Sequence, residues 1–352
     1  MLTPFRSITS ITTIGLTLTL LGAGMWLHAQ DGDTTTFHVK VDMVVLGFTV
    51  TDNKGKYVNG LKPKDFRVYE DDIGQKLNTF AEGNHTPMQV MPNGELRPLH
   101  TGTQAASASA PNAFTPGSVE NPNVVDLRSD SAGANVFVLF DTSNYMYRGF
   151  VYASDAIADF IRGLDRADSV AVYTYSRNLN RAVVLERDRN SAIAGLRKAV
   201  AGDDSALYNC LLLTLRDAAK VPGRKVVIVF SNGPDNASMV APDDVRAVAE
   251  DEGIPIYVIS TNEVNKDPIS ATIFKRISTN TGGKTYFAKT WQKQVEAFES
   301  IREDLGNSYV ITYYPQPNPN EGFRKIRVEL TDEAMRKYKV RARPGYRPQR
   351  GI

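Results

Sequence analysis

Residues 136–146 read Val-Phe-Val-Leu-Phe-Asp-Thr-Ser-Asn-Tyr-Met, and this stretch gives the strongest indication of the fold class. The five apolar residues at 136–140 form the pattern of a short buried strand. At Asp141 the chain enters a polar loop, and open α/β sheets bind ligands at the carboxyl ends of their strands. An Asp followed two residues later by Ser supplies hard oxygen ligands of the kind that hold Mg²⁺ or Ca²⁺. We therefore expect Asp141 and Ser143 to lie at a binding edge.

Strand and helix patterns alternate from residue 135 to about residue 307, as in a parallel sheet with helices on both faces. Apolar runs predict strands over 136–140, 170–175, 183–185, 226–230, 256–259 and 285–287. Apolar residues at helical spacing predict helices over 153–164, 191–200, 206–219, 242–252, 269–281 and 292–305. The predicted fold class is therefore α/β, with a doubly wound, mostly parallel sheet.

Two β segments flank this domain. Residues 31–81 carry strand patterns at 44–51, 66–69 and 77–80, and residues 308–352 carry them at 309–314, 323–330 and 338–342. Each segment is too small to bury a core by itself. We therefore predict that both flanks form one β-sandwich; the alternative is two separate β appendages on the α/β body.

Residues 82–134 show no sustained periodicity. The stretch contains Gln-Ala-Ala-Ser-Ala-Ser-Ala-Pro at 104–111, further Pro, Asn and Gly, and few large apolar residues. Such composition cannot bury enough apolar surface to fix one structure. We predict a disordered, low-complexity linker over 82–134.

The first thirty residues resemble a targeting segment. Arg6 precedes an apolar, Thr-containing run over 11–26, and small Ala29 stands just before a polar stretch. This pattern predicts a signal peptide over residues 1–30, cleaved after Ala29 or Gln30. The expected location is therefore periplasmic or secreted. The alternative is an uncleaved membrane anchor over residues 7–30, although the apolar run is short for a span of about 20 residues.

The net charge gives no support for a nucleic-acid partner. The chain has 352 residues and a formal net charge of +2, so nothing indicates binding to nucleic acid. The densest basic group is Arg336, Lys337, Lys339, Arg341 and Arg343. We interpret it as a solvated strand face rather than a patch for polyanions.

The scarcity of Cys and His argues against catalysis. Cys210 is the only cysteine and lies in an apolar helical pattern, which predicts a buried structural thiol. The four histidines, His28, His38, His85 and His100, all precede the α/β domain. That domain therefore has no His/Cys zinc cluster, and a Ser-His-Asp triad would need a histidine from elsewhere. We expect no enzymatic activity.

The α/β region, residues 135–307, resembles a von Willebrand factor type A domain. The whole chain is similar to a bacterial family of secreted VWFA-related proteins. This likeness rests on Gly-Leu-Lys-Pro-Lys-Asp-Phe-Arg-Val-Tyr-Glu-Asp at 60–71, Val-Arg-Ala-Arg-Pro-Gly-Tyr at 340–346, and the Asp141 loop between them.

The resemblance implies a metal-ion-dependent adhesion site built from three loops. The first loop keeps Asp141 and Ser143 of an Asp-x-Ser-x-Ser motif, but Tyr145 replaces its second Ser. In the second loop Ser205 stands where the family has Thr. In the third, Asn232 replaces the Asp of Thr-Asp-Gly.

These replacements predict a degenerate site. A phenol is a bulky, poor metal ligand, and a neutral amide removes one of two carboxylate charges. We therefore expect Mg²⁺ or Ca²⁺ to bind weakly or not at all, with Asp203, Asp204 or Asp235 as candidates to restore the charge. The alternative is a polar pocket held together by hydrogen bonds.

Three tyrosines, Tyr145, Tyr147 and Tyr152, surround the Asp141 loop and are expected to be exposed, although one of them could pack on the first helix. Aromatic residues at a loop rim often anchor protein partners. We predict a non-enzymatic, adhesion-type protein-interaction module, with Tyr145, Tyr147 and Asp235 as partner-binding candidates. The alternatives are a structural or assembly subunit acting through its β flanks and, with less support, a hydrolase using Asp141 or Asp235.

Overall fold

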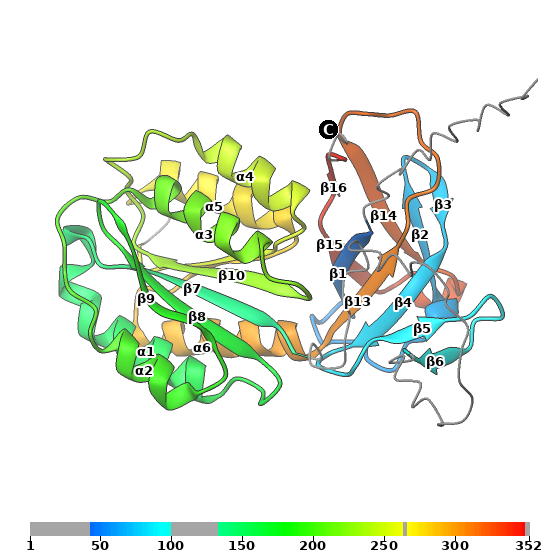
Figure 1. Cartoon of the computed structure of the whole chain (residues 1–352), viewed down its shortest axis with the longest axis horizontal. Coiled ribbons are helices and arrows are strands. Elements are labelled where there is room, and N and C mark those ends of the chain that lie inside the picture. Colours follow the sequence, from blue (N-terminus) through cyan, green and yellow to red (C-terminus); the bar gives the residue numbers. More distant parts are fainter. Residues whose placement is uncertain (1–42, 100–132, 263–265, 349–352) are drawn as a thin grey trace, which may run out of the picture. The chain divides into compact units, whose positions relative to one another are not determined.

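The computed structural model describes residues 43–99, 133–262 and 266–348 (Figure 1). The predicted signal segment and residues 100–132 of the predicted linker lie outside the described residues. Among the helices that are described, none combines the length and apolar character needed to cross a membrane.

A six-stranded sheet forms the centre of the α/β domain, in the order β12-β11-β10-β7-β8-β9. Its strands are β7 (Asn135–Asp141), β8 (Ser169–Tyr175), β9 (Leu179–Glu186), β10 (Lys225–Ser231), β11 (Ile256–Ser260) and β12 (Thr285–Phe287). All neighbours pair in parallel except β8 and β9, which are antiparallel. Residues 176–178 join that pair, and so short a connection cannot form a parallel crossover. The predicted mostly parallel sheet is confirmed.

Helices cover both faces of this sheet because β7 is apolar on both sides. Val136, Val138 and Phe140 face one core, and Phe137 and Leu139 face the other. The first core includes α1 (Phe150–Arg162), α2 (Arg189–Leu196) and α6 (Trp291–Gly306), and the second includes α3 (Leu207–Ala219), α4 (Pro242–Asp251) and α5 (Pro268–Thr281). A 3₁₀ turn, Asn144–Gly149, links β7 to α1.

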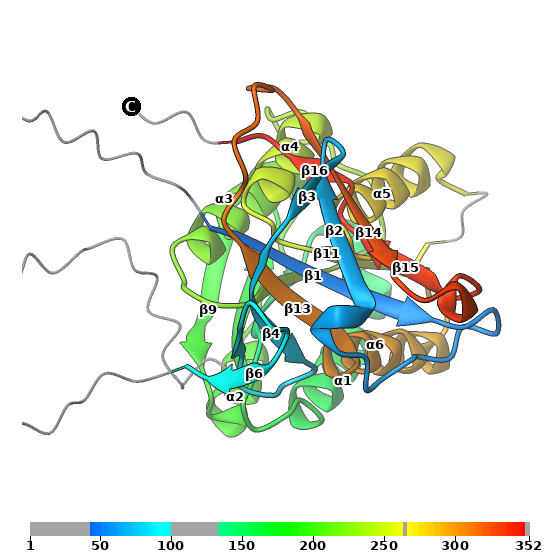
Figure 2. The ribbon, with the colours of Figure 1, turned by 90° about the vertical axis from the view of Figure 1, so that its right-hand side faces the viewer.

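Two further sheets, both antiparallel, form the β unit. One has the order β15-β1-β13-β4-β5-β6 and contains β1 (Val44–Thr51), β4 (Leu77–Glu82), β5 (Met88–Val90), β6 (Leu96–Pro98), β13 (Ser308–Tyr313) and β15 (Lys339–Ala342). The other has the order β16-β14-β2-β3 and contains β2 (Phe66–Glu70), β3 (Ile73–Gln75), β14 (Arg324–Leu330) and β16 (Gly345–Tyr346). Figure 2 looks toward this unit, with β2 and β14 in front of β1 and β13.

The two antiparallel sheets share one core, as a β-sandwich does. Phe48 and Tyr309 of one sheet and Phe66 of the other pack with ring centroids 5.1–5.6 Å apart. β1 lies between β13 and β15, so a strand from the N-terminal flank is paired on both sides with strands from the C-terminal flank. The prediction that both flanks build one β-sandwich is confirmed.

The predicted linker begins too early. β5 and β6 lie within residues 82–134, and β5 extends the sheet by pairing with β4. Each strand has three residues, and Met91–Gly94 closes a turn between them, with Gly94 at a φ of 82°. Runs this short carry too little periodicity to predict a strand.

The basic group near the C-terminus is not uniformly solvated, contrary to our interpretation. Arg343 is buried and donates hydrogen bonds to the carbonyl oxygens of Glu250 and Val45. Arg341 pairs with buried Asp304, at 2.6 Å between Nη2 and Oδ2, and donates to the carbonyl oxygen of Gly282. These two arginines join the β unit to the α/β domain. Alternation along a strand does not show that a second domain will cover one of its faces.

Candidate functional site

The three loops of the predicted site meet at the carboxyl edge of the α/β sheet. The backbone N–H of Asn144, after β7, donates to the carbonyl oxygen of Asp203 at 2.9 Å. The N–H of Asn236, after β10, donates to the carbonyl oxygen of Ser205 at 3.0 Å. Both contacts fix the loop that precedes α3 between the other two. Asp141, Ser205 and Asn232, which are distant in the sequence, therefore occupy one edge, as the order of the strands requires.

Asp141 is fully buried, and its carboxylate accepts hydrogen bonds from neighbouring groups of the protein. Its Oδ1 accepts a hydrogen bond from the N–H of Ser143 at 2.9 Å, and its Oδ2 accepts one from the hydroxyl of Ser231 at 2.7 Å. Burial raises the pKa of Asp141 because it disfavours the charged form, and the bonds from Ser143 and Ser231 oppose this rise.

Tyr175 and Ser231 complete a hydrogen-bond chain that the sequence did not reveal. The Tyr175 hydroxyl donates to Ser231 Oγ at 3.1 Å, and Ser231 Oγ donates to Asp141. Burial raises the pKa of Tyr175 well above its ordinary value, and the nearby Asp141 carboxylate adds to the rise. Both residues lie at the carboxyl ends of strands, so a position next to the predicted site could have been inferred from the sequence. A Tyr within an apolar strand pattern, however, is normally interpreted as a core residue.

Three oxygens at this edge are buried without a hydrogen-bond partner. They are Ser143 Oγ, Ser205 Oγ and Asn232 Oδ1. Buried polar atoms are almost always hydrogen-bonded, so unpartnered oxygens on these three loops are compatible with a small polar guest. All three belong to the predicted motif positions.

The two positions that depart from the motif contact each other. Asn232 Nδ2 donates a hydrogen bond to the carbonyl oxygen of Tyr145. A carboxylate has no hydrogen to donate, so Asp at this position could not make the contact. The side chain of Tyr145 is 40% exposed. The amide thus fixes the Asp141 loop in the arrangement that displays Tyr145.

These residues fit a hard cation by ligand type but not by charge. Asp141, Ser143, Ser205 and Asn232 would hold the ion through one carboxylate, two hydroxyls and one amide oxygen, the oxygen chemistry that Mg²⁺ and Ca²⁺ use. This set carries a single negative charge, one fewer than the motif implied by the resemblance would supply. Within the described residues, no three His, Cys, Asp or Glu side chains gather in a metal-binding group.

The acidic residues considered as replacements have structural contacts. Asp235 accepts hydrogen bonds from the N–H groups of Tyr208, Ala237 and Ser238 at 2.9–3.3 Å, which ties the loop after β10 to the first turn of α3. Asp204 pairs with Arg177. Asp203 is exposed. Partner binding by Asp235 stays a prediction, and its present contacts are structural.

Large apolar side chains are exposed around the same edge. Tyr147 is 75% exposed and Tyr152 is 61% exposed, so all three predicted tyrosines are accessible. Met239 follows β10, and Ile269 and Trp291 stand in the first turns of α5 and α6. In a parallel sheet, these loops and helix starts lie at the carboxyl ends of the strands. Composition alone did not single out Met239, Ile269 or Trp291.

Comparisons with known proteins give one family match, and it falls in the α/β region. A family model described as von Willebrand factor type A domain matches residues 136–234. No curated protein sequence matches the chain. Similar solved structures include the conserved hypothetical protein BatB of Bacteroides thetaiotaomicron, at 16% identity and a TM-score of 0.42 over 49% of this chain and 97% of that one.

The vWF domain of the type V pili tip protein Mfa5 of Porphyromonas gingivalis is also similar, at 10% identity and a TM-score of 0.42 over 53% of this chain and 98% of that one. A von Willebrand factor type A protein of Catenulispora acidiphila gives 13% identity and a TM-score of 0.42 over 57% and 63%. The match at residues 136–234 includes the loops that hold Asp141, Ser205 and Asn232. Within the α/β region, residues 136–234 therefore match the model of a von Willebrand factor type A domain.

Proposed function

We propose that the chain is an extracytoplasmic, non-enzymatic interaction module that binds a protein partner at the carboxyl edge of its α/β sheet. One observation carries the proposal: large exposed apolar side chains stand on the loops and helix starts of the same sheet edge as the polar site. Tyr145, Tyr147, Met239 and Ile269 all stand on loops or helix starts at this edge. Large exposed apolar groups that cluster in this way are typical of interaction surfaces.

The contacts of the site support binding rather than catalysis. The Asp141 carboxylate is engaged by Ser143 and Ser231 and is fully buried, so it is poorly placed to act on a substrate. Burial raises the pKa of the Cys210 thiol to about 12, which leaves almost no thiolate at neutral pH. The α/β domain contains no histidine.

The extracytoplasmic location rests on the predicted signal peptide over residues 1–30. Under this proposal the segment is cleaved, and the mature chain is periplasmic or secreted. The edge site then has the role of a degenerate adhesion site, in which Tyr145 replaces a metal-dependent contact with an aromatic one.

Action through the β flanks is the competing proposal. The edge strands of the two antiparallel sheets are short: β3 and β6 have three residues each, β15 has four and β16 has two. Short edge strands offer few free backbone groups for strand addition. The geometry therefore favours the α/β edge.

A capture experiment tests the proposal. The full chain, immobilised, is exposed to an extracytoplasmic extract, and retained proteins are identified and titrated. Tyr145→Ala should weaken capture by roughly 1–2 kcal/mol and leave the melting temperature nearly unchanged, since Tyr145 is an exposed loop residue.

Tyr314→Ala is the matched control, because Tyr314 is 50% exposed but follows β13 in the β unit. If Tyr145→Ala leaves capture intact while a change on the β unit abolishes it, the interaction belongs to the β flanks. Turnover of generic ester, peptide or phosphate substrates would instead establish an enzyme.

A further inference from the structure

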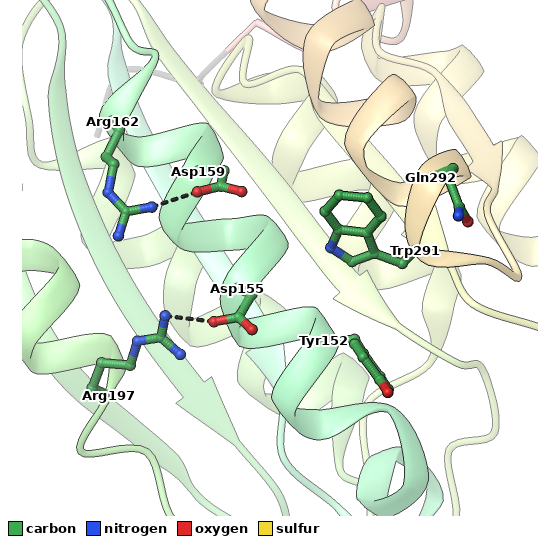
Figure 3. A pocket seen from close by; sticks show the side chains of 7 residues that line it. All are labelled: Tyr152, Asp155, Asp159, Arg162, Arg197, Trp291 and Gln292. Atoms are coloured by element: carbon green, nitrogen blue, oxygen red, sulfur yellow. Dashed lines mark hydrogen bonds and ion pairs between the residues drawn. The ribbon is translucent and has the colours of Figure 1, made fainter.

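A groove runs between α1 and the start of α6, beside Arg197, which follows α2 (Figure 3). The groove is shallow and open to solvent, with a volume of about 630 Å³. We propose that this groove binds a neutral oligosaccharide. Tyr152 and Trp291 stand at the same edge of the sheet as the Asp141 site, but the proposed function does not depend on them, and the ligand here belongs to another class.

One wall of the groove is a polar stripe of α1. Tyr152, Asp155, Asp159 and Arg162 follow one another at helical spacing, so they share one face of the helix. The opposite face, including Ile157, is buried against the sheet. The burial of that face fixes α1, so the stripe presents its side chains to the groove from a rigid support.

Two aromatic rings provide the apolar surface. Trp291, the first residue of α6, is 44% exposed, and Tyr152 is 61% exposed. Figure 3 shows Trp291 across the groove from the Asp155 and Asp159 side chains. Thr290 caps α6 and thereby fixes the backbone that carries Trp291. A sugar ring has an apolar face of C–H groups, and exposed aromatic rings with a polar edge suit such half-apolar ligands.

Two ion pairs provide the polar surface. Arg197 Nη2 lies 2.5 Å from Asp155 Oδ1, and Arg162 pairs with Asp159. The four side chains are 44–56% exposed, so these pairs add little to stability. The pairing instead holds the planar guanidinium and carboxylate groups in fixed orientations. A guanidinium has five N–H donors and a carboxylate several acceptor sites, so each pair retains the capacity to bond a ligand.

The charge of the groove selects the ligand class. Two carboxylates and two guanidiniums cancel, so a charged peptide or phosphate meets as much repulsion as attraction. Sugar hydroxyls both donate and accept hydrogen bonds, which matches a surface that offers both. The side-chain amide of Gln292, on α6, has the same double capacity.

Tryptophan fluorescence tests the proposal directly. The chain has two tryptophans, Trp26 and Trp291, so a full-length Trp26→Phe protein reports on the groove alone. The probes are neutral hexasaccharides of β-1,4-linked glucose, β-1,4-linked N-acetylglucosamine, α-1,4-linked glucose and α-1,6-linked mannose. We expect at least one to change the Trp291 emission saturably, with a dissociation constant on the order of 10⁻⁴ M that calorimetry reproduces.

Matched variants localise the binding. Asp155→Asn breaks an exposed ion pair at little cost in stability, and it should weaken binding about tenfold, while Trp291→Ala should abolish the calorimetric signal. Tyr314→Ala removes an exposed tyrosine of the β unit, outside the groove, and should leave binding unchanged. The proposal is overturned if none of the hexasaccharides binds or if binding survives both groove variants.

Discussion

The hydroxyl of Ser231 donates a hydrogen bond to Oδ2 of Asp141 at 2.7 Å, and neither residue has any solvent exposure. The two residues end the neighbouring strands β10 and β7. The polar edge of the sheet is thus organised from within: Tyr175 bonds Ser231, Ser231 bonds Asp141, and solvent is excluded. The charge of Asp141 therefore costs free energy, which its own hydrogen bonds only partly recover.

This cost predicts a pH dependence in metal-free buffer. The pKa of Asp141 is raised in the folded protein, with burial as the main cause. The stability from Asp141 is therefore fully present below its unfolded-state pKa of about 4 and is lost as pH rises through the folded-state pKa. Asp141→Asn keeps an acceptor for Ser143, and Ser231 can accept from the amide. As pH rises from about 4 to 8, the free energy of unfolding of this variant should fall less than that of the wild type. Urea denaturation at each pH would measure both.

Asp155→Asn, on exposed α1, is the control for this comparison and should follow the wild-type curve. Equal pH profiles for Asp141→Asn and the wild type would show that the Asp141 pKa does not shift on folding.

The edge site should bind Mg²⁺ weakly. The candidate ligands comprise one carboxylate, Asp141, and three neutral oxygens from Ser143, Ser205 and Asn232. Calorimetry should give a dissociation constant weaker than about 10⁻⁵ M, the limit of sensor-type sites. The double change Tyr145→Ser with Asn232→Asp should tighten it. Without Mg²⁺ the double variant should melt lower than the wild type, because a second carboxylate then lies near Asp141 and the bond to the Tyr145 carbonyl is lost. Tight binding by the wild type would contradict this account.

A buried ion pair stabilises the β unit. Glu70 is fully buried and bonds Arg324 at 2.9 Å, together with the hydroxyls of Tyr313 and Tyr346. Glu70→Gln leaves the Arg324 charge without its partner, which should lower the free energy of unfolding by about 3 kcal/mol. Glu329→Gln removes the exposed partner of Arg327 on the same strand and should cost less than about 1 kcal/mol. Urea denaturation would measure both, and equal losses would refute the distinction.

Cys210 should be inert in the folded protein. Its side chain is buried, and burial, aided by the charges of Asp235 and Asp141, raises its pKa to about 12. Since the thiolate is the reactive form, alkylation by iodoacetamide at pH 8 should be slow and should accelerate strongly in urea. As Cys210 is the chain's single cysteine, mass spectrometry of the intact protein reports on this site alone. Rapid alkylation without urea would show that α3 opens readily.

The N-terminal flank should not fold alone. In the protein β1 is paired on both sides with C-terminal strands, and the core of the β unit takes Tyr309 and Ile311 from β13. Residues 31–82 expressed alone should give a poorly dispersed NMR spectrum, while residues 135–307 should give a soluble α/β domain. Dispersed amide signals from residues 31–82 would disprove the shared core.

Much of the fold was predictable because long elements carry strong periodicity. The six strands and six helices of the α/β domain were all expected, and so was the pairing of the two β flanks. The missed strands, β3, β5, β6 and β16, have two or three residues each, too few to show alternation. Arg343 was read as solvated because a strand pattern does not reveal which other element will cover it.

The site was predictable in position but less so in chemistry. Motif spacing placed Asp141, Ser205 and Asn232 at one edge, and the loop contacts agree. The chain from Tyr175 through Ser231 depends on side-chain directions that spacing does not give. The contact between Asn232 and the Tyr145 carbonyl likewise arises only in three dimensions, so two replacements that look independent in the sequence are physically coupled.

The position of β1 between β13 and β15 has a consequence for the order of folding. The chain emerges with its N-terminus first, so β1 appears early, yet both of its partners follow the entire α/β domain. Domains generally fold as units while the chain emerges, so the α/β domain can fold first. Meanwhile β1, with Leu46 and Phe48 facing no partner, must remain open to solvent or to a chaperone. The β unit is therefore the last part to close, and a chain that stops before residue 339 cannot complete it.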